Sequence, residues 1–167
     1  MMWIERLRLP LVIAWGVIIV DQMTKWLILL RWPQPYTGEI DIIPWWLSLT
    51  YIRNEGVAFG LFQGVPQLFT VTSILITAGL IYTYLRHLPN QKLPVSILTG
   101  LIIGGAIGNV IDRLRWGYVV DFIKTLDGRF PIFNVADMCV SMGVISLSVY
   151  LYWLERRELR TAQTESA

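Results

Sequence analysis

Four long apolar stretches dominate the pattern of hydrophobic and polar positions along the chain. Each is 18 to 21 residues long, close to the ~20 residues that an α-helix needs to cross a hydrocarbon core of about 30 Å. Together they contain only three charged side chains, Asp21, Lys25 and Asp137. The pattern predicts a mainly α-helical membrane protein with four transmembrane helices, at about residues 10–30, 67–85, 94–111 and 135–154.

Two longer loops, residues 31–66 and 112–134, separate the first stretch from the second and the third from the fourth. In the first of these loops, apolar and polar residues alternate with a period of two over residues 39–42 and 47–53. Such alternation is typical of half-buried strands. We therefore expect a single integral membrane domain over residues 1–167, with a small antiparallel β-sheet at the membrane surface.

The distribution of basic residues predicts how the chain is oriented. The two terminal segments and the short middle connection carry seven Lys or Arg in 30 residues, against six in 59 residues in the two long loops. Because cytoplasmic segments are enriched in basic residues, we expect both termini in the cytoplasm and the long loops on the extracytoplasmic side. Tryptophans favour the same boundaries, with Trp32, Trp45, Trp46 and Trp116 near the outer helix ends and Trp3 and Trp153 near the inner ones.

Composition narrows the possible functions further. Hydrophobic residues make up 54% of the chain and charged residues 16%, and the formal net charge of +2 is too small to indicate a nucleic-acid partner. The single cysteine, Cys139, lies inside the fourth apolar stretch, so we expect neither a disulfide framework nor a cysteine metal site. The single histidine, His87, lies in the middle connection, away from the acidic residues. Ser–His–Asp chemistry and a histidine-bound zinc site are therefore excluded there, and we expect no metal or other cofactor.

Asp21 and Lys25 lie at membrane depth, four residues apart on one face of the first predicted helix. A charged side chain at the bilayer centre costs about 2.5–3.5 kcal/mol on insertion scales, so the two are expected to pair. The pair either serves the structure alone or organises a functional site, and the pattern leaves both possibilities open.

Glycines recur every four residues in the third stretch, at Gly100, Gly104 and Gly108, with Gly105 beside them. Small residues at this spacing allow another helix backbone to approach closely. We interpret the glycine stripe as a helix-packing face.

Acidic and amide residues are concentrated around the outer ends of the third and fourth stretches. Asp121 has apolar neighbours on both sides, and Asp137 lies one turn into an apolar helix. Two carboxylates that converge in a partly dry site share one proton, so one can activate water while the other protonates a carbonyl, as in aspartic peptidases. Alternatively, Asp137 caps the fourth helix while Asp121 pairs with Arg113 or Arg115. Spacing alone does not exclude Asp112 as a member of the acidic pair.

Five short motifs follow one another along the chain. They are DQMTK at residues 21–25, NEGVAF at 54–59, GGAIGNVIDR at 104–113, VVDF at 119–122 and FNVAD at 133–137. In this order and spacing, over roughly residues 20–145, they resemble the motifs of the bacterial lipoprotein signal peptidases, also called signal peptidase II. Every position that the chemistry of that family requires is matched.

The resemblance implies an aspartic endopeptidase that removes signal peptides from diacylglyceryl-modified prolipoproteins, cleaving just before the lipidated cysteine. Asp121 and Asp137 match the catalytic aspartates. The implied fold is a four-helix membrane bundle with a small extracytoplasmic sheet and a surface helix or loop after Gly56, where Gly56, Gly60 and Gly64 are candidate hinges. Substrate-binding or supporting positions match Asn54, Gly56, Asn109, Asp112, Arg113, Asn134, Ala136, Asp21 and Lys25.

The resemblance also implies where the protein acts. The expected location is the bacterial plasma (inner) membrane, as a multi-pass protein with its active site at the extracytoplasmic face. The expected partners are prolipoprotein substrates and membrane lipid, and the protein is expected to be a monomer.

Two other classes of function compete with a peptidase. A small proton-coupled transporter would use Asp21, Asp112 and Asp137 as proton relays, but it needs ionisable groups spread through the depth of the membrane. A non-catalytic assembly subunit would use the glycine stripe to dock a partner helix.

Overall fold

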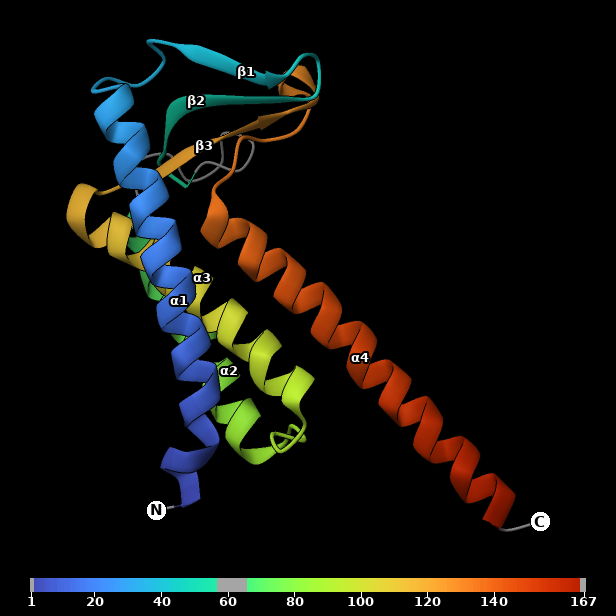
Figure 1. Cartoon of the computed structure of the whole chain (residues 1–167). Helices are drawn as coiled ribbons and strands as arrows, with labels where there is room; N and C mark the ends of the chain where they lie inside the picture. The colour runs from blue at the N-terminus through green and yellow to red at the C-terminus, as the bar shows by residue number, and fades with distance from the viewer. Residues whose placement is uncertain (1, 57–65, 166–167) are drawn as a thin grey trace.

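The computed structural model describes residues 2–56 and 66–165, which form four long helices and a three-stranded sheet (Figure 1). All four α-helices are long and apolar enough to cross a membrane, which confirms the predicted fold class. The surface helix or loop expected after Gly56 falls on residues 57–65, outside the described residues. In chain order the elements are α1 (Met2–Arg31), β1 (Glu39–Ile43), β2 (Leu47–Asn54), α2 (Pro66–Arg86), α3 (Leu93–Trp116), β3 (Val119–Thr125), the 3₁₀ turn η1 (Leu126–Gly128) and α4 (Val135–Glu165).

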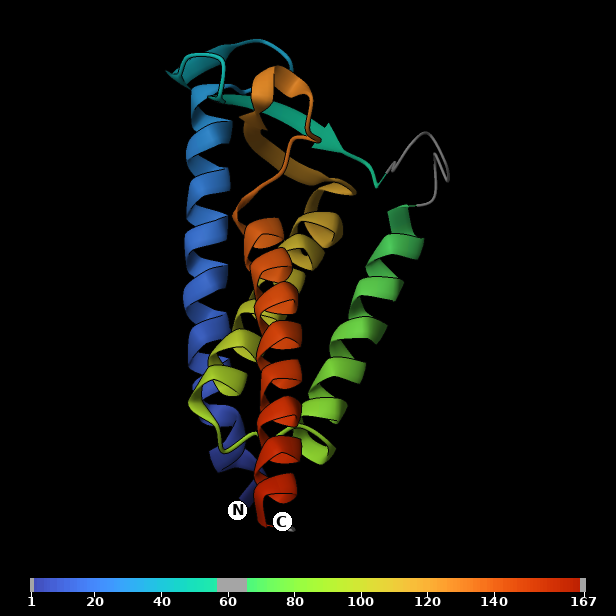
Figure 2. The same cartoon turned by 90° about the vertical axis from the view of Figure 1, so that its right-hand side faces the viewer.

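The sheet lies at one end of the helices, and both chain termini lie at the other end (Figures 1 and 2). Helix α3 packs against α1, α2 and α4, and its span is the most buried of the four. Because α3 contacts each of the other helices, its side chains determine how closely the bundle packs.

Glycines on α3 allow this close packing. A Cβ atom at Gly104 would lie 2.8 Å from the carbonyl oxygen of Ala14 and 2.7 Å from Cβ of Val17, both in α1. A Cβ atom at Gly105 would overlap the carbonyl oxygen of Ala136 in α4. The glycine stripe is therefore a packing face between helices of this chain, as the spacing indicates.

The strand order of the sheet is β1-β2-β3, and both pairings are antiparallel. Strands β1 and β2 are the two that the period-two alternation predicts. Strand β3 comes from the second long loop and was not predicted, although it places Asp121 opposite Ile52 of β2. The first four residues of β3 are all buried. A strand that is buried on both faces has a mostly apolar run of residues and no alternation of apolar and polar positions. Periodicity therefore does not distinguish it from other buried segments.

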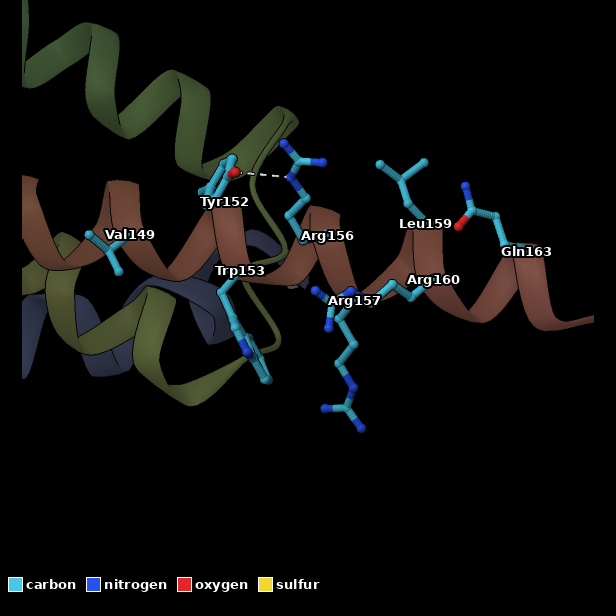
Figure 3. Close-up of a pocket in the computed structure, with 8 residues that line it drawn as sticks. All are labelled: Val149, Tyr152, Trp153, Arg156, Arg157, Leu159, Arg160 and Gln163. Carbon is cyan, nitrogen blue, oxygen red and sulfur yellow. Dashed lines mark hydrogen bonds between the residues drawn. The ribbon is translucent and has the colours of Figure 1, made fainter.

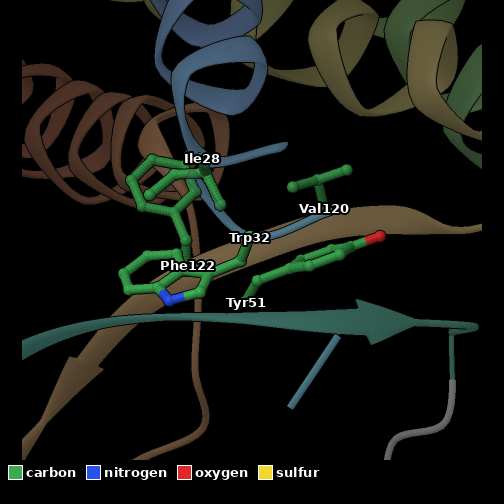
Figure 4. Packing of buried hydrophobic residues seen from close by; sticks show 5 residues of the cluster. All are labelled: Ile28, Trp32, Tyr51, Val120 and Phe122. Atoms are coloured by element: carbon green, nitrogen blue, oxygen red, sulfur yellow. The ribbon is translucent and has the colours of Figure 1, made fainter. Parts of the chain in front are cut away.

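A compact apolar cluster attaches the sheet to the end of α1 (Figure 4). Ile28 and Trp32 come from α1 and the residue after it, Tyr51 from β2, and Val120 and Phe122 from β3. Trp32 follows the outer end of α1, as the sequence predicts, but it is only 6% exposed. Sequence position placed it near a helix end, but the sheet folds over it.

Three helix boundaries differ from prediction because charged residues end an apolar run without ending a helix. Helix α3 continues past residue 111 to Trp116, so Asp112 and Arg113 are helical. Gly117 caps its C-terminus, with a φ of 79° in the left-handed region and an N–H that donates to the carbonyl oxygen of Arg113. Helix α1 begins at Met2 instead of residue 10, and α4 continues to Glu165 instead of ending at 154.

The close contact between α3 and α1 predicts that Gly104→Ala destabilises the protein by about 1–3 kcal/mol, because the added methyl group meets backbone atoms. Thermal unfolding of the purified protein in detergent, followed by tryptophan fluorescence, measures this as a lower unfolding temperature. Gly16→Ala in α1 is the matched control, because a Cβ atom there meets nothing within 4 Å. Equal unfolding temperatures for the two variants would contradict the packing interpretation.

Candidate active site

Asp121 lies in the middle of β3, and its side chain is completely buried. Each carboxylate oxygen accepts one hydrogen bond from an amide side chain. Asn54 Nδ2, at the end of β2, donates to Oδ2 over 2.7 Å, and Asn134 Nδ2, just before α4, donates to Oδ1 over 2.6 Å. The carboxylate is thus held in one orientation by partners that carry no charge.

This environment raises the pKa of Asp121 to about 7. Burial is the largest cause, because it disfavours the charged form, and the nearby negative charge of Asp137 acts in the same direction. The hydrogen bonds from Asn54 and Asn134 lower the pKa but do not offset these effects. Asp121 is therefore able to hold a proton near neutral pH.

Asp137 occupies the first turn of α4 and is only half-buried. Its Oδ1 accepts a hydrogen bond of 2.7 Å from Asn109 Nδ2. Asn134 and Asp137 also cap the helix reciprocally, because Asp137 N–H donates to Asn134 Oδ1 over 2.9 Å and Asn134 N–H donates to Asp137 Oδ2 over 3.3 Å. This is the geometry of a capping box, with Asn134 as the N-cap.

Asn134 therefore contacts both acidic side chains: its side chain contacts Asp121, and its backbone contacts Asp137. Asn109 strengthens this link, because its Oδ1 accepts a hydrogen bond of 3.1 Å from Asn134 Nδ2 while its own Nδ2 donates to Asp137. Two asparagines from different elements thus hold the two carboxylates in one constellation.

A buried ion cluster lies directly behind this constellation. Lys25 Nζ is 2.9 Å from Asp21 Oδ2 and 2.9 Å from Asp112 Oδ2, and all three side chains are at most 3% exposed. Lys25 also donates to Asn109 Oδ1 over 3.1 Å. The predicted pair of Asp21 and Lys25 is therefore present, and it connects to the candidate site through Asn109.

The two carboxylates of the cluster also bind backbone next to the two candidate catalytic residues. Asp21 Oδ1 accepts a hydrogen bond of 3.0 Å from the N–H of Ala136, which precedes Asp137. Asp112 Oδ2 accepts one of 3.1 Å from the N–H of Val120, which precedes Asp121. Because Asp112 is engaged with Lys25 and β3, the geometry favours Asp121 and Asp137 as the acidic pair.

The alternative pairing of Asp121 with Arg113 or Arg115 is not found among the described residues, since its hydrogen-bond partners there are the two asparagines. The helix-capping alternative is partly correct, because Asp137 takes part in the cap although Asn134 is the N-cap residue. Arg113 is half-buried, and its guanidinium interacts electrostatically with the carboxylates of Asp137 and Asp121.

Gly56 orients Asn54. Its N–H donates to Asn54 Oδ1 over 2.9 Å, which leaves the Asn54 amide group directed at Asp121. Its φ of 90° is strained for any residue with a Cβ atom, and that atom would also overlap the ring of Phe69. Gly56 therefore contacts Asn54, which in turn donates to Asp121.

Gln22, which belongs to the DQMTK motif, also contacts the ion cluster, although the sequence analysis assigns it no role. Its Nε2 donates to Asp112 Oδ1 over 2.9 Å and to Asp21 Oδ2 over 3.2 Å. The signal available in the sequence was its place between Asp21 and Lys25, one residue from an intramembrane acid. Among residues 5–56 and 67–161, no group of three or more acidic, histidine or cysteine side chains is arranged to hold a metal ion.

A four-helix membrane bundle with a small sheet at one end is also the fold of solved bacterial membrane enzymes. One of these, determined at 1.9 Å resolution by the in meso method, is 35% identical and superposes with a TM-score of 0.75, covering 85% of this chain and 91% of the other. Residues 13–153 match the signal peptidase (SPase) II family. The chain belongs to this family, and the protein is accordingly a membrane-bound peptidase.

Relatives named lipoprotein signal peptidase support the same assignment. The protein from Symbiobacterium thermophilum is 42% identical over 151 residues, covering 89% of this chain and 97% of the relative. The protein from Listeria monocytogenes serotype 4a is 37% identical over 147 residues, covering 87% of this chain and 94% of the relative. The match therefore spans nearly the whole of each relative.

The ion cluster predicts that Lys25→Met lowers stability by about 3–5 kcal/mol, because it leaves two buried carboxylates without a cation. Thermal unfolding in detergent measures the effect. Lys124→Met is the matched control, since Lys124 pairs with Glu39 on the exposed sheet surface, where ion pairs contribute little. The triple variant D21N/K25M/D112N is expected to unfold at a higher temperature than Lys25→Met. A smaller effect for Lys25→Met than for Lys124→Met would contradict this account.

Proposed function

We propose that this protein is an aspartic endopeptidase that removes signal peptides from diacylglyceryl-modified prolipoproteins, cleaving just before the lipidated cysteine, with Asp121 and Asp137 as its catalytic residues. The observation that carries the proposal is the asparagine-bridged pair of carboxylates in which Asp121 has a pKa of about 7. The substrate class rests on the family and on relatives named lipoprotein signal peptidase.

The different surroundings of the two carboxylates give each a distinct role. Asp121, fully buried, holds the proton, while Asp137, half-buried, is the carboxylate that reaches water. The oxygen of a water molecule attacks the scissile carbonyl carbon while Asp137 takes a proton from that water. At the same time, Asp121 donates its proton to the carbonyl oxygen. When the C–N bond breaks, Asp137 passes its proton to the leaving amine and Asp121 recovers one from the tetrahedral hydroxyl.

Other polar groups around the pair are suited to substrate binding. Asn54, Asn109 and Asn134 keep the carboxylates in place, and Arg113 supplies a positive charge close to them. Arg113 also borders a cavity of about 380 Å³ between α2 and α3, whose lining includes Val71 and Ile74. An apolar cavity beside a cation suits a substrate that carries both acyl chains and a polar backbone.

The proposal places the protein in the bacterial inner membrane with both termini in the cytoplasm and the sheet outside. The basic residues of the terminal segments favour this orientation. A precursor anchored by its signal peptide and its lipid then moves within the bilayer plane and presents its scissile bond at the outer surface, where the acidic pair lies.

The distribution of charge within the helices favours a peptidase over a transporter. Helix α2 carries no acidic or basic residue before Arg86, and α4 carries none between Asp137 and Glu155. The acidic pair and the ion cluster instead gather at the end of the bundle that bears the sheet. No series of ionisable side chains along α2 and α4 connects the two membrane faces.

Replacement of either aspartate tests the catalytic pair. Asp121→Asn and Asp137→Asn are each expected to lower the cleavage rate of a diacylglyceryl-modified precursor by at least ~100-fold, because acid–base catalysis by a positioned side chain contributes about 10²–10⁴. Purified variants are incubated with the precursor, and the product is followed by gel mobility.

Asp127→Asn is the matched control, because this acid lies in η1, directly after the strand that carries Asp121, but its side chain is 70% exposed. It should cleave at the wild-type rate. The same precursor without the diacylglyceryl group should remain uncut by the wild-type protein. Near-normal cleavage by either site variant would disprove the assignment, whereas cleavage of the unmodified precursor would disprove only the substrate class.

The raised pKa of Asp121 predicts the pH dependence of cleavage. Because Asp121 must be protonated to act as the acid, kcat/KM should fall as pH rises above about 7, about ten-fold per pH unit well above it. Initial rates between pH 6 and pH 9 measure this limb, and Asp127→Asn should leave it unchanged. A rate that rises steadily from pH 7 to pH 9 would contradict the role given to Asp121.

A further inference from the structure

Helix α4 extends beyond the part of the bundle that packs against it. Leu154 is the last buried residue among those whose burial the structure describes, and every residue from Glu155 to Thr161 is exposed. In Figure 1 the C-terminal turns of α4 lie apart from the other helices. Residues 155–161 of α4 therefore form an exposed helix surface beyond the buried part of the bundle.

The charges on these turns are separated by sign around the helix. Arg156, Arg157 and Arg160 line one open hollow together with Tyr152 and Trp153 (Figure 3). At about 100° per residue, positions 155 and 158 fall on the opposite side, and both are glutamates. The helix end thus has a basic–aromatic face, defined by Tyr152, Trp153, Arg156, Arg157 and Arg160, although its overall charge is small.

The aromatic rings hold two of the arginines in position. Cζ of Arg156 lies 5.2 Å from the ring centre of Tyr152, whose hydroxyl also accepts a hydrogen bond of 3.0 Å from Arg156 Nε. Cζ of Arg157 lies 5.4 Å from the ring centre of Trp153. A guanidinium has five N–H donors, and the bond to Tyr152 engages one of those of Arg156, so the others are suited to an anionic acceptor.

The basic–aromatic face lies at the depth of lipid headgroups. Asp137 is at the sheet end of α4, and at 1.5 Å per residue Arg156 is about 28 Å and Arg160 about 34 Å further along the helix. A hydrocarbon core is about 30 Å thick, so these arginines reach the opposite membrane surface while exposed Val149 and Ile145 remain among acyl chains. Tyr and Trp are enriched at the same level.

We propose that the basic–aromatic face of α4 binds the phosphate headgroup of an anionic glycerophospholipid in the leaflet opposite the acidic pair. The N–H groups at the guanidinium edges donate to the phosphate oxygens, because their fork geometry suits a phosphate. The acyl chains lie along the apolar surface of α4 on the bilayer-centre side of Trp153. The proposal depends on the four-span arrangement and not on the peptidase activity.

Lipid binding to the purified full-length protein tests the proposal. The protein in detergent is titrated with phosphatidylglycerol or phosphatidylcholine of identical acyl chains, and bound lipid is counted by native mass spectrometry. The wild-type protein should prefer phosphatidylglycerol. In the variant R156Q/R157Q/R160Q, the preference for phosphatidylglycerol over phosphatidylcholine should be at least five-fold lower. The reason is that one basic side chain near an anionic surface raises the affinity roughly five-fold. The single variant Arg157→Gln should give an intermediate value.

The matched control is R8Q/R86Q/K92Q, which removes three positive charges from the same end of the bundle but leaves the basic–aromatic face intact. It should keep the wild-type preference within two-fold. Equal losses in the two triple variants, no preference in the wild-type protein, or displacement of the lipid by millimolar inorganic phosphate would each overturn the proposal. Circular dichroism and size-exclusion profiles should be the same for all variants.

Discussion

The ammonium group of Lys25, held between the carboxylates of Asp21 and Asp112, is the interaction on which the arrangement of the site depends. Three charges removed from solvent are costly unless all their hydrogen-bonding capacity is used. One cation does not satisfy two carboxylates, so the remaining oxygen positions take N–H groups from Gln22, Val120 and Ala136. These hydrogen bonds connect β3 and the start of α4 to the ion cluster between α1 and α3.

The buried ion cluster forms only because the glycines of α3 allow α1 to pack closely against it. A Cβ atom at Gly108 would lie 2.6 Å from Asp21 Oδ2, so the glycine that allows α1 to approach also makes room for the acid. The packing face formed by Gly104 and Gly108 brings the backbones close enough for Lys25 to reach across to Asp112 and Asn109. A wider helix spacing would leave the charges without partners.

The packing of the sheet and helices also gives the carboxylates of Asp121 and Asp137 different environments. Burial beneath the sheet and the charge of Asp137 raise the pKa of Asp121 to about 7, while the two amide groups fix the orientation of its carboxyl group and oppose part of that rise. Asp137 lies at a helix start and is more open to solvent. Environments that distinguish two carboxylates are what acid–base catalysis by such a pair requires. In the proposed peptidase, Asn134 is the residue that couples them, because it caps α4 and donates to Asp121 at once.

The sequence by itself determined the four spans, the first two strands and the candidate residues, because length, hydropathy and the order of short motifs are properties of the linear chain. Only the tertiary structure decided which distant segments meet around the acidic residues, since Asp21 and Ala136, 115 positions apart, are joined by a hydrogen bond. It also showed that β3 completes the sheet, that Trp32 is buried beneath it, and that Asp112 serves the ion cluster. Periodicity reports which face of an element is apolar, whereas the partner of a buried charge is set by contacts between distant segments.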